Sequence, residues 1–207
     1  MRNKFIIAAT ASTLLLASSL TALAAPVSTA PGQNKLQCFS GTTDGGTYGG
    51  TCALQGNGAM GPATLNNSDS NTNGDYSGVY ITNSGLIGQP LSSVTQLSYT
   101  YSGTVAPMPG DLSLNIPINT SGGTTTEEYA YVDAYYCPGV GGHVDVVNDA
   151  NCGIWFNGVE YANWAALVAA YPDAVITDTP FMVAERTPSE PSAVWTINKV
   201  KLGKPGK

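Results

Sequence analysis

The feature that most constrains this chain is an alternation of apolar and polar residues with a period of two. It is clearest over Leu112–Ile118, where leucine and isoleucine alternate with serine, asparagine and proline. Successive side chains of a strand point to opposite faces, so such a segment buries one face only. Clusters of glycine, proline, asparagine and aspartate separate further predicted strands at Val79–Ile81, Leu97–Tyr101, Tyr129–Tyr136, Val144–Val147, Gly153–Phe156, Phe181–Ala184 and Val194–Ile197.

Many short strands joined by turns predict an all-β fold, and we expect a two-layer β-sandwich with jelly-roll connectivity. We expect Val144–Val147 and Gly153–Phe156 to pair around Asn148–Asn151. Pro117 has no N–H group, so its strand is predicted to lie at a sheet edge or to end in a bulge. Apolar residues spaced by three and four predict one short helix near residues 161–170, covering one end of a sheet.

The first residues predict export. Arg2 and Lys4 precede an apolar stretch that ends in Ala22-Leu23-Ala24, a small-residue cleavage pattern. A membrane anchor is the alternative, but serines and threonines interrupt the stretch, and a span needs about 20 apolar residues. We therefore expect a signal peptide over residues 1–24, a flexible leader over 25–35, a single domain over 36–203 and a basic tail over 204–207. The expected location is secreted, either extracellular or at the cell surface.

The cysteine count agrees with that compartment. An even number of cysteines in an exported chain indicates disulfides, and Cys38, Cys52, Cys137 and Cys152 allow three pairings. Proximity along the chain favours Cys38–Cys52 and Cys137–Cys152, each closing a loop of about 15 residues. The alternative is a zinc site, but C-x-x-C spacing is missing and His143 is the only histidine.

The charges restrict the class of ligand. Lysine and arginine are absent between Lys35 and Arg186, and every carboxylate except Glu190 lies in that interval. Neutralising phosphates requires several cationic side chains, so we expect no nucleic-acid partner. Charged residues make up 11% of the chain, against about 25% in ordinary domains. This low charge, with many glycines, threonines and asparagines, leaves a structural matrix or surface protein as one hypothesis.

One loop resembles the first half of a calcium-binding loop. Asp69, Asn71, Asn73 and Asp75 follow the pattern D-x-N-x-N-G, whose oxygen atoms suit a hard cation. Position 12 of the pattern is Tyr80, where a bidentate glutamate should stand. Calcium is therefore the one cofactor that the sequence suggests, and a polar surface loop without metal is the alternative.

A sugar site is the main functional expectation. Tyrosine and tryptophan stack on apolar sugar faces, and carboxylates accept hydrogen bonds from sugar hydroxyls. We predict a ligand site containing Asp133, Tyr135, Trp155 and Tyr161. The alternative is that these aromatic residues simply favour pleated surfaces and cores. Trp164 and Trp195 are expected in the core.

The sequence assigns no catalytic residue. It contains no G-x-S-x-G motif, and a Ser-His-Asp triad would depend on His143 alone. Glycoside hydrolysis needs only two carboxylates, so a carboxylate-dependent extracellular hydrolase is the second hypothesis. The carboxylates available for it are Glu127, Glu128, Asp133, Asp145, Glu160 and Glu185.

The second half of the chain resembles a group of small secreted bacterial β-sandwich proteins, with jelly-roll or concanavalin-like domains. The resemblance covers about 100 residues, and its motifs are structural. It implies a jelly-roll fold and glycan-related binding, and it transfers no catalytic residue, because fold alone does not determine function. The residues that carry it are Leu112–Ile118, Tyr131–Ala134, Cys137 with Cys152, Tyr161–Trp164 and Trp195–Val200.

Overall fold

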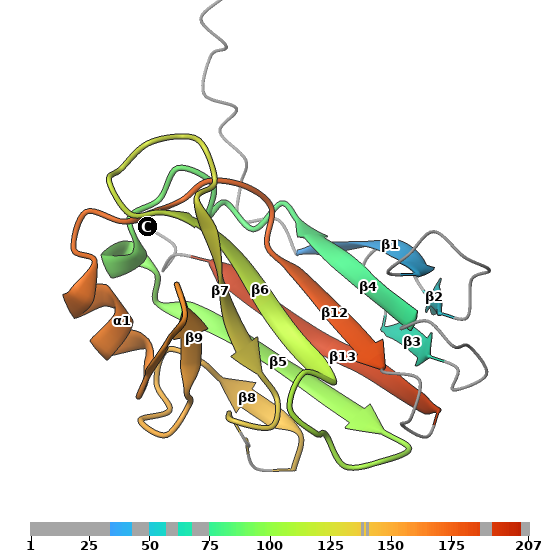
Figure 1. The fold of residues 1–207 in the computed structure, drawn as a ribbon. Helices are drawn as coiled ribbons and strands as arrows, with labels where there is room; N and C mark the ends of the chain where they lie inside the picture. Colours follow the sequence, from blue (N-terminus) through green and yellow to red (C-terminus); the bar gives the residue numbers. More distant parts are fainter. Residues whose placement is uncertain are drawn as a thin grey trace, which may run out of the picture.

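The structure, a computed structural model, describes residues 34–42, 50–56, 62–67, 75–137, 139, 141–186 and 192–203. Strands dominate it, and two antiparallel sheets pack against each other (Figure 1). Apart from a short 3₁₀ turn at Leu91–Ser93, the elements are β1 (Lys35–Thr42), β2 (Thr51–Leu54), β3 (Ala63–Asn67), β4 (Asp75–Thr82), β5 (Gln96–Gly103), β6 (Leu112–Asn119), β7 (Glu128–Asp133), β8 (His143–Asp145), β9 (Ile154–Phe156), β10 (Val159–Tyr161), α1 (Trp164–Ala170), β11 (Val175–Ile176), β12 (Phe181–Arg186) and β13 (Ala193–Gly203).

The connectivity is that of a jelly roll. The large sheet has the order β1-β4-β12-β6-β7-β9-β10, with β11 beside β6, and the small sheet has the order β2-β3-β13-β5-β8. The chain alternates between the sheets from β3 to β6, and β12 and β13 later insert between strands placed earlier. This nesting of two Greek keys confirms the predicted two-layer β-sandwich and its jelly-roll connectivity.

The core lies between the two sheets. Leu112, Leu114, Ile116 and Ile118 of β6 all point inward and are completely buried, as the alternation predicted. Burying each such side chain contributes about 1.5–3 kcal/mol. Trp164 and Trp195 are also in the core, in agreement with the sequence analysis; the core contains Trp195 from the small sheet and Trp164 from the helix.

The prediction that Pro117 marks an edge strand is wrong, because β6 lies in the middle of the large sheet. The carbonyl oxygen of Pro117 accepts a hydrogen bond from the N–H of Thr177, between β11 and β12. The N–H and C=O groups of one strand residue point to the same side. The missing N–H of Pro117 therefore faces Thr177, just past the end of β11, so the proline removes one hydrogen bond there and none from the pairing of β6 with β7 or β12.

The predicted pairing of Val144–Val147 with Gly153–Phe156 is also wrong. β8 pairs with β5 in the small sheet, whereas β9 pairs with β7 and β10 in the large sheet. The loop Asn148–Asn151 thus crosses from one sheet to the other instead of closing a hairpin. Two boundaries also differ: β7 ends at Asp133 in a turn, and α1 begins at Trp164, because the Asn163 side chain accepts a hydrogen bond from the Ala166 N–H.

Both disulfides favoured by proximity are present. Cys38–Cys52 joins β1 of the large sheet to β2 of the small sheet, so it links the two layers at one edge. Cys137–Cys152 joins the turn after β7 to the residues before β9. Among the residues that the structure describes, no helix is long and apolar enough to cross a membrane. The predicted signal peptide, residues 25–33 of the predicted leader and the basic tail lie outside the described residues. The last residue of the predicted leader, Lys35, is described and begins β1.

Candidate functional site

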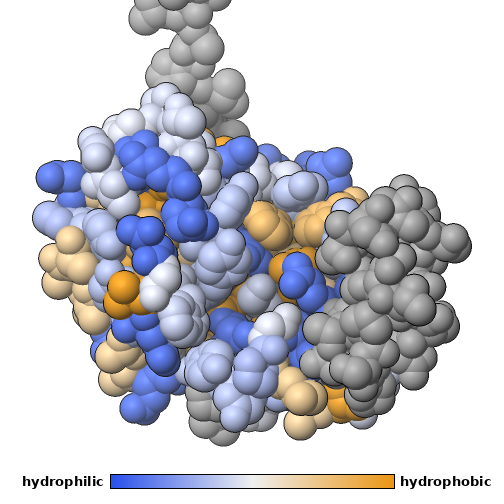
Figure 2. Space-filling model, in the orientation of Figure 1, coloured by the Kyte–Doolittle hydropathy of each residue, from blue (hydrophilic) through white to orange (hydrophobic). Residues whose placement is uncertain are grey.

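The outer face of the large sheet carries a groove of about 570 Å³. Strand register places Val183, Ser113 and Asp133 side by side across β12, β6 and β7. Tyr131 of β7 lies directly opposite Trp155 of β9. Figure 2 shows the same side of the molecule, with hydrophilic surface around recessed apolar patches. The groove is lined by Pro109, Gly110, Ser113, Asn115, Glu128, Tyr131, Asp133, Tyr136, Trp155, Phe156, Asn157, Gly158, Val183 and Glu185.

Polar and apolar groups alternate over the bottom of this groove. Val183, Ser113 and Asn115 are buried there, and the Asn115 Nδ2 group donates hydrogen bonds to the Ser113 carbonyl oxygen (3.3 Å) and to its Oγ (3.0 Å). Tyr131 and Trp155, by contrast, are 41% and 39% exposed. The groove therefore offers exposed aromatic surface beside hydrogen-bonding groups held in fixed positions, the usual composition of a small-molecule site.

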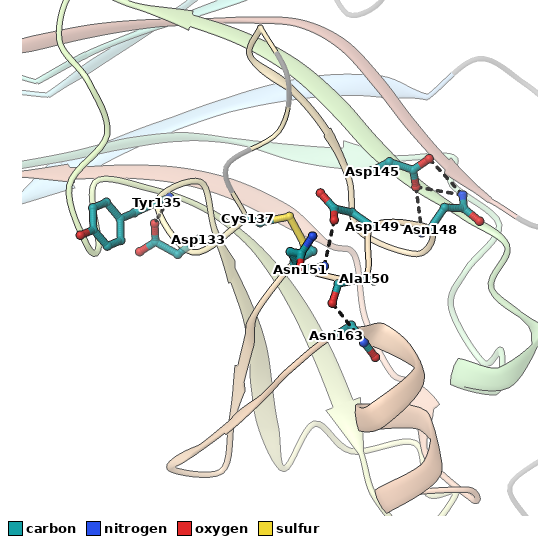
Figure 3. The surroundings of a disulfide bond; sticks show 10 residues. Asp133, Tyr135, Cys137, Asp145, Asn148, Asp149, Ala150, Asn151 and Asn163 are labelled. Carbon is teal, nitrogen blue, oxygen red and sulfur yellow. Dashed lines mark hydrogen bonds between the residues drawn. A yellow bond between two sulfur atoms is a disulfide. The ribbon is translucent and has the colours of Figure 1, made fainter.

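The Cys137–Cys152 disulfide fixes one wall of the groove. The Gly153 N–H donates a hydrogen bond to the Tyr136 carbonyl oxygen (3.1 Å), so the residues on both sides of the disulfide are joined again through the backbone. The crossing loop before Cys152 is ordered by its own hydrogen bonds, including one from the Asn163 side chain to the Ala150 carbonyl oxygen (Figure 3). These links hold β9, and with it Trp155, against β7.

Asp133 organises the end of the groove. Its Oδ1 accepts a hydrogen bond from the Tyr135 N–H (2.8 Å), and its Oδ2 accepts one from the Gly110 N–H. Burial raises the pKa of the Asp133 carboxyl, and these two hydrogen bonds oppose that shift because they stabilise the charged form. Both carboxylate oxygens of Asp133 thus accept hydrogen bonds from backbone N–H groups, and these bonds link the turn after β7 to the loop before β6.

Glu185 projects from β12 on the opposite wall. The loss of solvent around its carboxyl raises its pKa, although the residue remains exposed at the groove rim. Burial raises the pKa of Tyr131 most, and the nearby ionisable groups of Glu128, Tyr129 and Glu185 raise it further. The groove is therefore acidic, and the described residues that line it include no lysine or arginine.

The structure brings two of the four predicted ligand residues together, since Asp133 and Trp155 both line the groove. Tyr135 is half exposed, packs edge-on against Tyr136, and does not line the groove. Tyr161 faces the other way: it packs against the core, and its hydroxyl donates a hydrogen bond to the Tyr171 hydroxyl. Sequence reasoning missed Tyr131, although its alternation with Asp133 placed both on one strand face.

Of the predicted calcium loop, Asp69, Asn71 and Asn73 lie outside the described residues. Asp75 begins β4 and is buried. Within the described part of the chain, no group of three or more histidine, cysteine, aspartate or glutamate side chains is arranged to hold a metal ion. Calcium binding at this loop remains a prediction.

Comparisons with protein-family models, with curated proteins and with solved structures found no match. The function must therefore be inferred from the groove itself.

Proposed function

We propose that this protein is a secreted, non-catalytic β-sandwich that binds a neutral glycan in the groove of the large sheet. The observation that carries the proposal is the pair Tyr131 and Trp155, adjacent on β7 and β9 and each about two-fifths exposed above buried Ser113 and Asn115. Aromatic rings cover the apolar face of a sugar ring, and hydroxyl, amide and carboxylate groups bond its hydroxyls.

The charges in the groove support a neutral ligand. Glu128, Asp133 and Glu185 line it, and the whole chain has a net charge of −6. An anionic polysaccharide would be repelled by these carboxylates, whereas a neutral sugar can use them as hydrogen-bond acceptors. The two disulfides support the extracellular part of the proposal, because such bonds persist in oxidising compartments.

Depletion from solution tests the proposal. The oxidised protein is incubated with insoluble neutral polysaccharides, and the unbound fraction is measured with and without a chelator. We expect binding to at least one neutral polysaccharide, and an affinity at least about fivefold lower for Trp155→Ala, the effect of removing an aromatic anchor worth about 1 kcal/mol. Tyr135→Ala is the matched control, because Tyr135 is exposed but does not line the groove.

The outcomes separate the hypotheses. If Trp155→Ala and the wild type bind equally well, the groove is not the site. If no polysaccharide is bound and the protein assembles by itself as its concentration rises, the structural-protein hypothesis is favoured instead. Loss of binding with chelator would show that a divalent cation is needed, and would favour the predicted calcium site at the Asp69–Asp75 loop.

A second candidate is a carboxylate-dependent extracellular glycoside hydrolase. One observation favours it: Asp133 and Glu185 line the same groove, and burial raises the pKa of both carboxyls, as a general acid requires. The two hydrogen bonds that Asp133 accepts from backbone give it a structural role as well. Release of reducing sugar in the depletion assay, abolished by Glu185→Gln, would establish hydrolysis; binding without release supports the binding protein.

A further inference from the structure

A second hollow lies on the same outer face of the large sheet. It has a volume of about 420 Å³, and Tyr80, Phe181 and Tyr129 provide its aromatic surface, with Gln37, Thr82 and Asp178 as polar neighbours. The two hollows share no lining residue; Tyr129 and Phe181 line the second hollow, and Tyr131 lines the groove. The Tyr129 ring lies 5.7 Å from the Phe181 ring and 6.4 Å from the Tyr131 ring, so these side chains connect the two hollows.

Strand register aligns the two hollows. Tyr80 of β4 lies opposite Phe181 of β12, Phe181 opposite Asn115 of β6, Asn115 opposite Tyr131 of β7, and Tyr131 opposite Trp155 of β9. These five residues, called here the transverse row, stand at one level on five neighbouring strands, and opposite residues of paired strands point to the same face. The row therefore crosses the sheet from β4 to β9, through strands that lie side by side in Figure 1.

The row has the length of an extended ligand. Neighbouring strands lie about 4.8 Å apart, so the four spacings from β4 to β9 place Tyr80 and Trp155 roughly 19 Å apart. Tyr80, Tyr131 and Trp155 are each about two-fifths exposed along this line. A single sugar ring covers only a small part of that length, whereas a chain of several rings can contact both hollows at once.

The packing of the rings keeps this surface in place. The Phe39 ring lies 4.7 Å from the Tyr80 ring and 5.9 Å from the Phe181 ring. Phe39 passes over Gly78, where a Cβ atom would stand only 2.3 Å from the Phe39 ring. The glycine thus allows Phe39 to support both rings from β1. Because the rings are braced before any ligand arrives, little side-chain entropy is lost on binding.

We propose that the groove and the second hollow are two ends of one extended site, which takes a neutral polysaccharide chain of several sugar rings lying along the transverse row, across the strands. This inference rests on the proposed glycan function and specifies its ligand class. Asp178 adds a carboxylate in the second hollow, and the described lining of both hollows contains no cationic side chain, so the whole path suits an uncharged chain.

The test compares ligands of increasing length. Neutral β-linked gluco-, xylo- and manno-oligosaccharides, from disaccharide to hexasaccharide, are titrated calorimetrically into wild type, Tyr80→Ala, Trp155→Ala, the double variant and the control Tyr135→Ala. We expect wild-type affinity to rise with chain length. For the longest chain bound, each single variant should lower the affinity at least about fivefold. For the shortest chain bound, only one of the variants Tyr80→Ala and Trp155→Ala should lower the affinity, because a short chain reaches only one of the two hollows.

Two results would overturn this inference while the proposed function stands: an affinity that stops rising at the disaccharide, or a long-chain affinity that Tyr80→Ala leaves unchanged. A wild type that binds no member of the series and no polysaccharide of the depletion panel would overturn both. Tyr80→Phe keeps the ring and should retain long-chain binding. The urea midpoint of each variant shows that a loss of binding does not come from unfolding.

Discussion

The Cys137–Cys152 disulfide should stabilise the fold and, separately, hold the wall of the groove that carries Trp155. The bond spans a sequence separation of 15 residues. The loss of loop-closure entropy in the unfolded chain is then worth about 3 kcal/mol. For a domain of this size, this free energy corresponds to a decrease of about 6–12 °C in Tm when both cysteines are replaced by alanine. The unfolding free energy is measured by urea titration, followed by tryptophan fluorescence.

The second disulfide provides the matched control. Cys38–Cys52 spans a separation of 14 residues, so the entropy argument gives it the same value of about 3 kcal/mol. It lies at the opposite edge of the sandwich, away from the groove. Replacing either pair by alanine should therefore lower the unfolding free energy by similar amounts. If neither double variant is destabilised, the loop-closure reasoning is refuted.

Only the Cys137–Cys152 variant should change the local stability of the groove wall. β9 is paired with β7 at a single position, Tyr131 with Trp155, so the disulfide is a major tether of the β9–β10 hairpin. Amide hydrogen exchange of β9 should become faster in Cys137→Ala/Cys152→Ala than in Cys38→Ala/Cys52→Ala. Equal β9 exchange in the two variants would refute the positioning role of this bond.

Three further changes test the account of the fold. Tyr99→Phe should raise the unfolding free energy by about 1–3 kcal/mol in a urea titration, because the buried Tyr99 hydroxyl has no hydrogen-bond partner among the described residues; a destabilised variant would contradict this. Gly78→Ala should cost about 1–3 kcal/mol in the same assay, since the new Cβ would meet the Phe39 ring and stand 2.4 Å from the Met182 carbonyl oxygen; an unchanged midpoint would show that the strands shift freely. Burial raises the pKa of the Glu185 carboxyl above its usual 4.5, so the folded state binds this proton more tightly than the unfolded state does. The unfolding free energy of the wild type therefore falls as the pH rises from 4.5 through the raised pKa. Glu185→Gln should therefore be more stable than wild type at a pH above the raised pKa, and the difference should disappear at a pH below 4.5. Urea midpoints measured across this pH range check the prediction, and a difference that grows as the pH falls would refute it.

The period-two pattern was sufficient to predict the fold class. Leu112–Ile118 could bury four apolar side chains together only as a strand facing a core, and these four side chains are in the core. The polar face of β6, which the alternation predicted to be exposed, is buried as well. The cysteine pairs also followed from the chain, because short loops close at a smaller entropic cost than long ones. These features depend on local spacing, which a single sequence displays directly.

Strand order was not readable in the same way. Pro117 suggested an edge, but it lies opposite Thr177, where β6 passes from its pairing with β11 to its pairing with β12. The crossing of Asn148–Asn151 between sheets likewise depends on which strands β8 and β9 meet. Such pairings depend on packing between residues that are distant in sequence, so they cannot be predicted from local propensity.

The candidate site shows the same division. The sequence by itself determined that aromatic and acidic side chains such as Asp133 and Trp155 would occupy strand faces. Only the tertiary structure decided that Trp155 stands beside Tyr131, that Tyr161 turns toward the core, and that Tyr80 and Phe181 complete a row across the sheet. The physical reason is that alternation places a side chain on one face of its own strand, whereas its neighbours on that face come from the register of strands that the chain reaches much later.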